Sequence, residues 1–176
     1  VPMQAFSSFH DAGEKKLLNG FVIPAGQTPE QDLTDALDNV FAHQNVAPFI
    51  SRRLIQRFIS ANPSPSYVER VATVFNDNGF GVRGDLGAVI KAILLDVEAR
   101  TPVAGGIGGK LVEPLLRLVS LWRAFDASAP NGRYIYSQPN NDFGQARLRS
   151  PSVFNFFSPD YAPAGELSDQ GLVSPE

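Results

Sequence analysis

Hydrophobic positions recur at helical spacing through the middle of the chain, from about residue 28 to residue 125. The first of these segments starts at Thr28, a helix-capping residue type, with Pro29 in the first turn and Gln31 as the partner of a capping box. Apolar residues then return at intervals of three and four: Leu33, Ala36, Leu37, Val40 and Phe41. The pattern predicts an amphipathic helix that ends near His43.

The same periodicity predicts three more helices between residues 46 and 100. One covers about residues 46–61, and its apolar face consists of Phe49, Ile50, Leu54, Ile55, Phe58 and Ile59. The next starts with a cap at Ser64 and stops near Gly79. Asp85 caps the fourth, which is expected to run to about Arg100.

A fifth helix is predicted over residues 110–125, after a glycine-rich stretch at residues 105–109. Pro114 lies in its first turns, where the N–H donor that proline lacks would be unpaired anyway. Five main helices without a strand pattern predict an all-α fold, as a bundle or in orthogonal packing. We expect residues 28–100 to hold the core, so that Leu54→Ala would cost about 2 to 5 kcal/mol.

The chain ends have no regular periodicity, and the predicted single domain has four parts. These are an N-terminal strap with an HDAGEK motif (1–27), the helical core (28–125), a polar loop (126–148) and an aromatic, proline-rich strap and tail (149–176). In this last part, the rings of Phe154, Phe156 and Phe157 are too apolar to leave in water. We expect at least two of them to be buried against the helices, with Pro151 and Pro159 bracketing them in extended conformation.

Composition and charge exclude several classes of protein. The chain has 176 residues, no cysteine and a net charge of −3, with charges of both signs interspersed. It therefore contains neither disulfides nor thiolate metal sites, and general nucleic-acid binding is not expected. No stretch approaches the roughly 18 apolar residues of a membrane-spanning helix.

The two histidines are the first candidates for chemistry. His10 and Asp11 resemble the His-Asp pair of metal-dependent phosphohydrolases, but such a site needs further ligands, and His43 is the only other histidine. The preferred interpretation is a turn in which Asp11 bonds the backbone and Gly13 has positive φ, with His43 as a helix C-cap. No metal site is predicted. His10, Asp11 and His43 stay catalytic candidates because two imidazoles and a carboxylate that meet could bind a metal or act as an acid/base pair.

Three arginines form the basic cluster of the chain: Arg52, Arg53 and Arg57. Such clusters are usually solvated or paired with carboxylates, but guanidinium groups also suit phosphate or uronate, which makes this a candidate anion-binding site. Exposed aromatic side chains such as Tyr134 or Tyr161 would add a surface on which sugars stack. Lys110, placed at the start of the fifth helix, is expected to pair with a carboxylate.

Four segments of the chain, in order, are typical of one known family: HDAGEKKLLNG (10–20), the helical stretch 37–100, GKLVEPLLRL (109–118) and RSPSVFNFFSPDY (149–161). Together they resemble the bacterial domain of unknown function 1800 (DUF1800) family. The matching motif positions are His10, Asp11, Lys15, His43, Arg53, Lys110 and Pro114. The resemblance implies the C-terminal portion of a larger, often exported protein, hence a periplasmic or secreted location, and the start at Val1 is interpreted as that of a fragment.

The resemblance supplies no reaction, so two classes of function stay open and the sequence does not decide whether the chain is an enzyme. We favour a helical interaction or scaffold module of an exported bacterial protein that binds a protein partner or a surface glycan, without a cofactor. The alternative is part of a metal-dependent or other hydrolase that residues outside this chain complete, with His10, Asp11 and His43 contributing. Partner and oligomeric state are not predicted.

Overall fold

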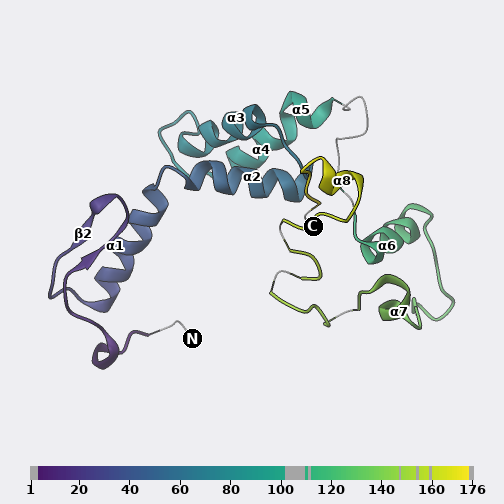
Figure 1. Cartoon of the computed structure of the whole chain (residues 1–176), viewed down its shortest axis with the longest axis horizontal. Coiled ribbons are helices and arrows are strands. Elements are labelled where there is room, and N and C mark those ends of the chain that lie inside the picture. Colours follow the sequence, from purple (N-terminus) through teal and green to yellow (C-terminus); the bar gives the residue numbers. More distant parts are fainter. Residues whose placement is uncertain are drawn as a thin grey trace. The chain divides into compact units, whose positions relative to one another are not determined.

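The computed structural model describes residues 4–101, 110, 112–146, 148–153, 155–158 and 160–174. The described residues are predominantly helical, which confirms the all-α prediction (Figure 1). The chain divides into two compact units, residues 1–50 and 51–176.

The first unit combines a small hairpin with one helix. Strands β1 (Lys15–Lys16) and β2 (Val22–Ile23) pair antiparallel, with Lys15 opposite Ile23. The 3₁₀ turn η1 (Ser7–Phe9) precedes the hairpin, and a second one, η2 (Leu18–Gly20), connects its strands. Asn19 and Gly20 turn the hairpin with φ of 58° and 73°, a conformation that suits an Asn-Gly pair. The helical periodicity of the sequence did not predict this hairpin.

Helix α1 (Pro29–Ala42) starts where the sequence predicts. The Thr28 hydroxyl accepts the backbone N–H of Gln31 at 3.2 Å, but the Gln31 side chain donates to Asp35, so the predicted capping box does not form. The apolar side chains of α1 are largely exposed: Leu33, Leu37, Val40 and Phe41. Asp32, in contrast, is buried at 7% exposure.

Helix α2 (Val46–Phe58) begins in the first unit and ends in the second, three residues before the predicted end at Ala61. Three of its buried positions, Ala47, Ser51 and Ile55, follow one another at intervals of four, and Gln56 beside Ile55 is buried as well. Leu54 is only half-buried and Phe49 and Phe58 are about half exposed, so the predicted apolar face was rotated. The core substitution to test is therefore Ile55→Ala and not Leu54→Ala.

Helices α3 (Pro65–Asn76) and α4 (Leu86–Leu95) pack side by side and supply most of the core (Figure 1). Their Ncap residues, Ser64 and Asp85, accept the N–H groups of Tyr67 and Ala88 as predicted. The buried apolar side chains of these two helices are Tyr67, Val71, Ala72, Phe75, Val89 and Ile93. The core thus lies in the predicted stretch, but mainly in α3 and α4.

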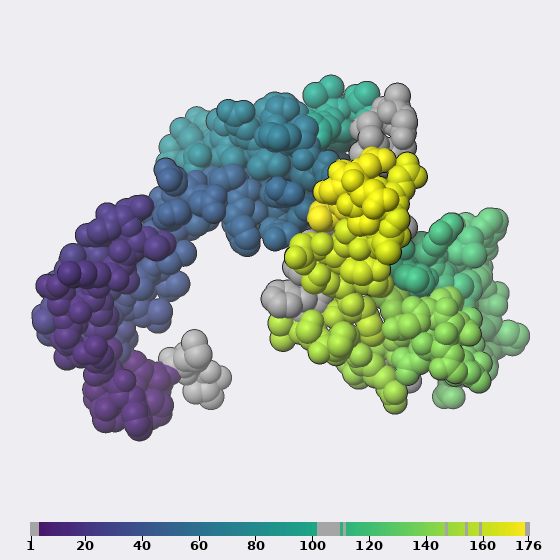
Figure 2. Space-filling model, in the orientation of Figure 1, coloured from purple at the N-terminus to yellow at the C-terminus, as the bar shows by residue number. Residues whose placement is uncertain are grey.

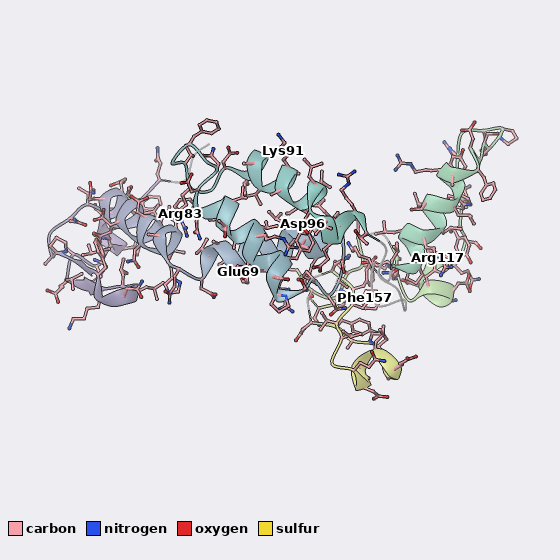
Figure 3. All side chains as sticks on the ribbon, turned by 90° about the horizontal axis from the view of Figure 1, so that it is seen from above. Glu69, Arg83, Lys91, Asp96, Arg117 and Phe157 are labelled. Carbon is pink, nitrogen blue, oxygen red and sulfur yellow. The ribbon has the colours of Figure 1, made fainter. Side chains whose placement is uncertain are left out.

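The predicted fourth helix is interrupted at Asp96, which caps a separate short helix, α5 (Val97–Arg100) (Figure 3). The Asp96 side chain accepts the N–H of Glu98 and a bidentate pair of bonds from Arg70 on α3, at 2.7 and 2.8 Å. This pairing lowers the pKa of Asp96 and raises that of Arg70. The break therefore serves to tie α3 to the end of α4.

The loop between α3 and α4 is held by side chains of its own residues. The carboxylate of Asp77 accepts the N–H groups of Gly79 and Gly81, and the Asn78 amide oxygen accepts those of Phe80 and Val82. The Asn78 amide also donates to Asp85 at 2.8 Å. Phe80 nevertheless points into solvent and is 89% exposed.

The remaining helices are α6 (Pro114–Ala124), α7 (Pro139–Phe143) and α8 (Glu166–Asp169). Helix α6 begins at Pro114, four residues later than predicted, because proline occupies its first position. Lys110 lies outside this helix and donates to the main-chain oxygen of Arg57 at 2.8 Å, not to the expected carboxylate. That oxygen lies in the last turn of α2, whose negative dipole end favours a cation.

The C-terminal strap is partly buried. Phe156 and Phe157 are half-buried, and the Phe157 ring lies 4.7 Å from that of Tyr161; Phe154 and Pro159 lie outside the described residues. Beyond the strap, Asn62 exchanges two hydrogen bonds with the backbone of Val173, at 2.8 and 3.0 Å. These bonds fix the tail to the loop between α2 and α3.

Candidate functional site

A cluster of charged side chains in the first unit joins the HDAGEK segment to α1. The Nε2 of His10 and the Nζ of Lys15 both lie 2.7 Å from Oδ2 of Asp32. The Lys15 contact, followed by that of His10, lowers the pKa of Asp32 although burial opposes the shift. Among the described residues, Oδ1 of Asp32 has no hydrogen-bond partner.

The rest of the segment is arranged as a closed turn. The Asp11 carboxylate accepts the N–H of Gly13 at 2.8 Å, which confirms the predicted side-chain turn. Gly13 does not have positive φ, which corrects that prediction; a Cβ there would lie only 3.0 Å from the Asp11 carboxylate. Lys15 also donates to the main-chain oxygens of Asp11 and Gly13. The Lys15 ammonium group thus bonds both to the turn and to the Asp32 carboxylate.

The structure does not bring the two histidines together. His43 is the C-cap of α1, as predicted, and its Nδ1 accepts the N–H of Asn45. His10 contacts Asp32 in the first turn, and the helix from Asp32 to Ala42 spans about 15 Å at 1.5 Å per residue. In the described part of the chain, no group of three or more His, Cys, Asp and Glu side chains is arranged to hold a metal ion.

The predicted anion cluster is spread along an exposed face of α2. Arg52, Arg53 and Arg57 are all exposed, and Arg53 donates to the amide oxygen of Gln56 at 3.1 Å. The Ser158 hydroxyl, and less strongly the charge of Arg53, lowers the pKa of Asp160 in the strap. Both of these interactions involve Arg53 and lie within the second unit.

A second site, which the sequence did not predict as such, is built on a buried polar network at the start of α6. Glu113 and Gln145 are 8% and 1% exposed. The Gln145 amide donates to Glu113 at 2.7 Å and accepts the N–H of Leu115, one of the unpaired donors of the helix start. Asn155 donates to the other oxygen of Glu113 at 3.1 Å. The network therefore fixes α6, the segment after α7 and the strap relative to one another. Figure 2 shows the green and yellow-green segments of this part of the chain lying against one another.

Four aromatic side chains of α6, α7 and the loop between them are arranged in two pairs. The rings of Trp122 and Tyr134 lie 5.3 Å apart, and those of Tyr136 and Phe143 are stacked at 4.8 Å. The Tyr134 hydroxyl donates to the backbone of Ala127, and the Tyr136 hydroxyl donates to Asp142 at 2.9 Å, which raises the pKa of Tyr136. Each tyrosine is thus held both at its ring and at its hydroxyl.

The rings line a groove of about 770 Å³ between α6, α7 and the loop that joins them. Besides Trp122, Tyr134 and Tyr136, the groove is lined by leucine side chains of α6, by the polar side chains Ser137, Gln138, Asn140 and Asn141, and by Arg149. A second hollow of about 430 Å³ shares the Trp122–Tyr134 wall and is lined by Arg123 and Asp126. We call the two hollows together the aromatic groove.

The sequence held part of the information for this site. Tyr134 was a predicted stacking residue, but Trp122 lay in the predicted fifth helix (110–125) without a role of its own, and Tyr136 had no role either. Residues 126–148 were predicted to be a polar loop, and α7 within them begins at a proline, a residue type favoured in a first turn. Glu113, Gln145 and Asp32 are polar residues in apolar or loop contexts, and only their contacts show what they do.

The fold and the groove define a predominantly helical protein with a hollow lined by aromatic and polar side chains. The sequence model of the family described as "Protein of unknown function (DUF1800)" matches residues 2–176, and the chain belongs to this family. No curated protein and no solved structure matches the chain. None of the helices in the described ranges has both the length and the apolar character needed to cross a bilayer.

Proposed function

We propose that this chain is a non-catalytic binding module that holds a surface glycan in the aromatic groove. The observation that carries the proposal is the wall formed by Trp122, Tyr134 and Tyr136. A pyranose ring has an apolar face of C–H groups and a polar rim of hydroxyls. Aromatic faces and carboxamide groups are complementary to these two features, and the groove offers both.

The groove is suited to binding because its walls are fixed in advance. Ring contacts and hydroxyl bonds hold the tyrosines, and the buried Glu113–Gln145 network holds the elements that carry them. Little side-chain entropy is then lost when a ligand enters. The expected export of family members would place this module among cell-surface glycans, and detection of the chain in the periplasmic or secreted fraction tests that part.

The experiment is a titration of the purified chain with soluble polysaccharides, both neutral and acidic. Trp122 is the single tryptophan, so its fluorescence reports directly on the groove. We expect a saturable change with at least one polysaccharide, and we expect Tyr134→Ala and Tyr136→Ala to abolish it. Tyr67→Phe is the matched control, since Tyr67 is a buried core residue of α3. No response to any polysaccharide, or a response equal in the groove variants, would contradict the proposal.

The alternative function is part of a hydrolase that uses His10. It is favoured by the pairing of the His10 imidazole with a buried carboxylate, which orients an imidazole for proton transfer in known acid/base sites. Hydrolysis of an activated ester that His10→Gln abolishes and Asp11→Asn leaves unchanged would support this function. Equal rates for the native chain and the His10 variant would exclude a role of His10 in catalysis.

A further inference from the structure

We infer that the glycan bound in the aromatic groove is anionic, bearing carboxylate or sulfate groups that Arg149 and Arg123 recognise. This inference rests on the proposed function and names the ligand class of the same groove. Arg149 lines the larger hollow and Arg123 the smaller one, and the two hollows share the wall formed by Trp122 and Tyr134. A polymer lying across this wall would meet one guanidinium in each hollow.

Both arginines are available to a ligand. In the part of the chain that the structure describes, neither guanidinium forms an ion pair or a hydrogen bond. Arg70, in contrast, has a structural role, because its guanidinium group donates two hydrogen bonds to Asp96. Planar guanidinium groups bind carboxylate and sulfate oxygens through such paired N–H donors.

The local charge also differs from that of the whole chain. Residues 112–158 contain five arginines against three carboxylates, whereas the rest contains 10 Lys and Arg against 15 Asp and Glu. Two of the three carboxylates are already bonded: Glu113 accepts from Gln145 and Asn155, and Asp142 accepts from Tyr136. The segment that forms the groove therefore carries a net positive charge, although the net charge of the whole chain is negative.

Asp126 makes the two hollows unequal. Its carboxylate lines the smaller hollow together with Arg123 and would repel an anion there. Among the residues that the structure describes, no carboxylate lines the larger hollow, where Arg149 lies. We therefore expect Arg149 to contribute more to anion recognition than Arg123, and Asp126→Asn to strengthen binding.

The test compares three polysaccharides with the same fluorescence titration: sodium alginate carries carboxylates, dextran sulfate carries sulfates and dextran is neutral. We expect tighter binding of at least one acidic polymer than of dextran, and the preferred one identifies the anion. Arg149→Gln should weaken that binding about three- to tenfold and Arg123→Gln less. Lys91→Gln on α4 removes the same charge outside the groove and should change nothing (Figure 3).

Three results would overturn the inference. Dextran bound as tightly as the acidic polymers, with loss in Tyr136→Ala, would leave the proposed function standing and remove the anionic ligand. An equal effect of Lys91→Gln and Arg149→Gln would indicate unspecific charge attraction. An oligothymidylate bound as tightly as the acidic glycans would show a general polyanion groove, since aromatic and basic grooves also hold single-stranded nucleic acid.

Discussion

Removal of the Gln145 side chain is the sharpest test of how the groove is built. In Gln145→Ala, the Glu113 oxygen loses its donor at 2.7 Å and the Leu115 N–H loses its acceptor at 3.2 Å. A buried polar group left without a partner costs about 1 to 3 kcal/mol, and more when it is charged. Two such groups give an expected loss of about 2 to 5 kcal/mol in the free energy of unfolding.

Urea denaturation followed by Trp122 fluorescence measures this loss where it arises, because Trp122 lies in α6. With a typical dependence of about 1 to 3 kcal/mol per molar urea, a loss near 3 kcal/mol lowers the midpoint by about 1 to 3 M. Gln44→Ala is the matched control, since Gln44 is exposed, and should stay within about 0.5 kcal/mol. A Gln145 variant that also stays within that range would refute the assigned network.

Three further outcomes are expected. Ile55→Ala should cost about 2 to 5 kcal/mol and Leu54→Ala clearly less, because Ile55 is fully buried and Leu54 is not; equal losses in urea denaturation would show that the burial of α2 is wrongly described. The pKa of Asp32 is lower in the folded chain than its ordinary value of 3.8, so its stabilising effect is present above that pH and disappears as the pH falls through the folded value. Acid unfolding followed by circular dichroism should therefore lose this component in Asp32→Asn, and an unchanged acid transition would argue against the contact. Asn62→Ala should speed amide exchange at Val173 by removing both bonds to the tail, whereas Asn45→Ala, a control elsewhere, should not; unchanged exchange at Val173 would indicate a tail held by other contacts.

The sequence predicted most helices because their starting residues have short-range roles. Thr28, Ser64 and Asp85 cap helices through bonds to residues three positions later, and such bonds depend on local sequence alone. The break at Asp96 was missed although its cap on the Glu98 N–H is local, because Asp96 is also held by Arg70, which lies 26 positions away. Likewise, the role of Gln145 depends on Glu113, 32 positions earlier, and that of Asp32 on His10, 22 positions earlier.

The choice of buried face on α2 failed for a different reason. Apolar residues occur on more than one side of this helix, so periodicity alone does not say which side meets the core. Small residues, Ala47 and Ser51, lie on the buried side together with Ile55. The prediction gave large apolar side chains more weight than small ones, and it therefore placed the buried face of α2 on the wrong side of the helix. The aromatic groove was missed for a related reason. Trp122 lies in a predicted helix whose apolar residues would be expected to face inward, but no residue of α6 is buried.

In the loop that contains Phe80, an exposed residue is not expected to be a site of rapid proteolysis. Chymotrypsin cleaves after aromatic residues, and Phe80 is 89% exposed, close to the 79% of Phe125 at the end of α6. A protease must, however, draw several residues into its cleft in extended form, and the bonds from Asp77 and Asn78 to the backbone resist that unwinding. Of these two sites, chymotrypsin is therefore expected to cleave after Phe125 before it cleaves after Phe80, and a fragment that keeps the α3–α4 pair intact should accumulate during digestion.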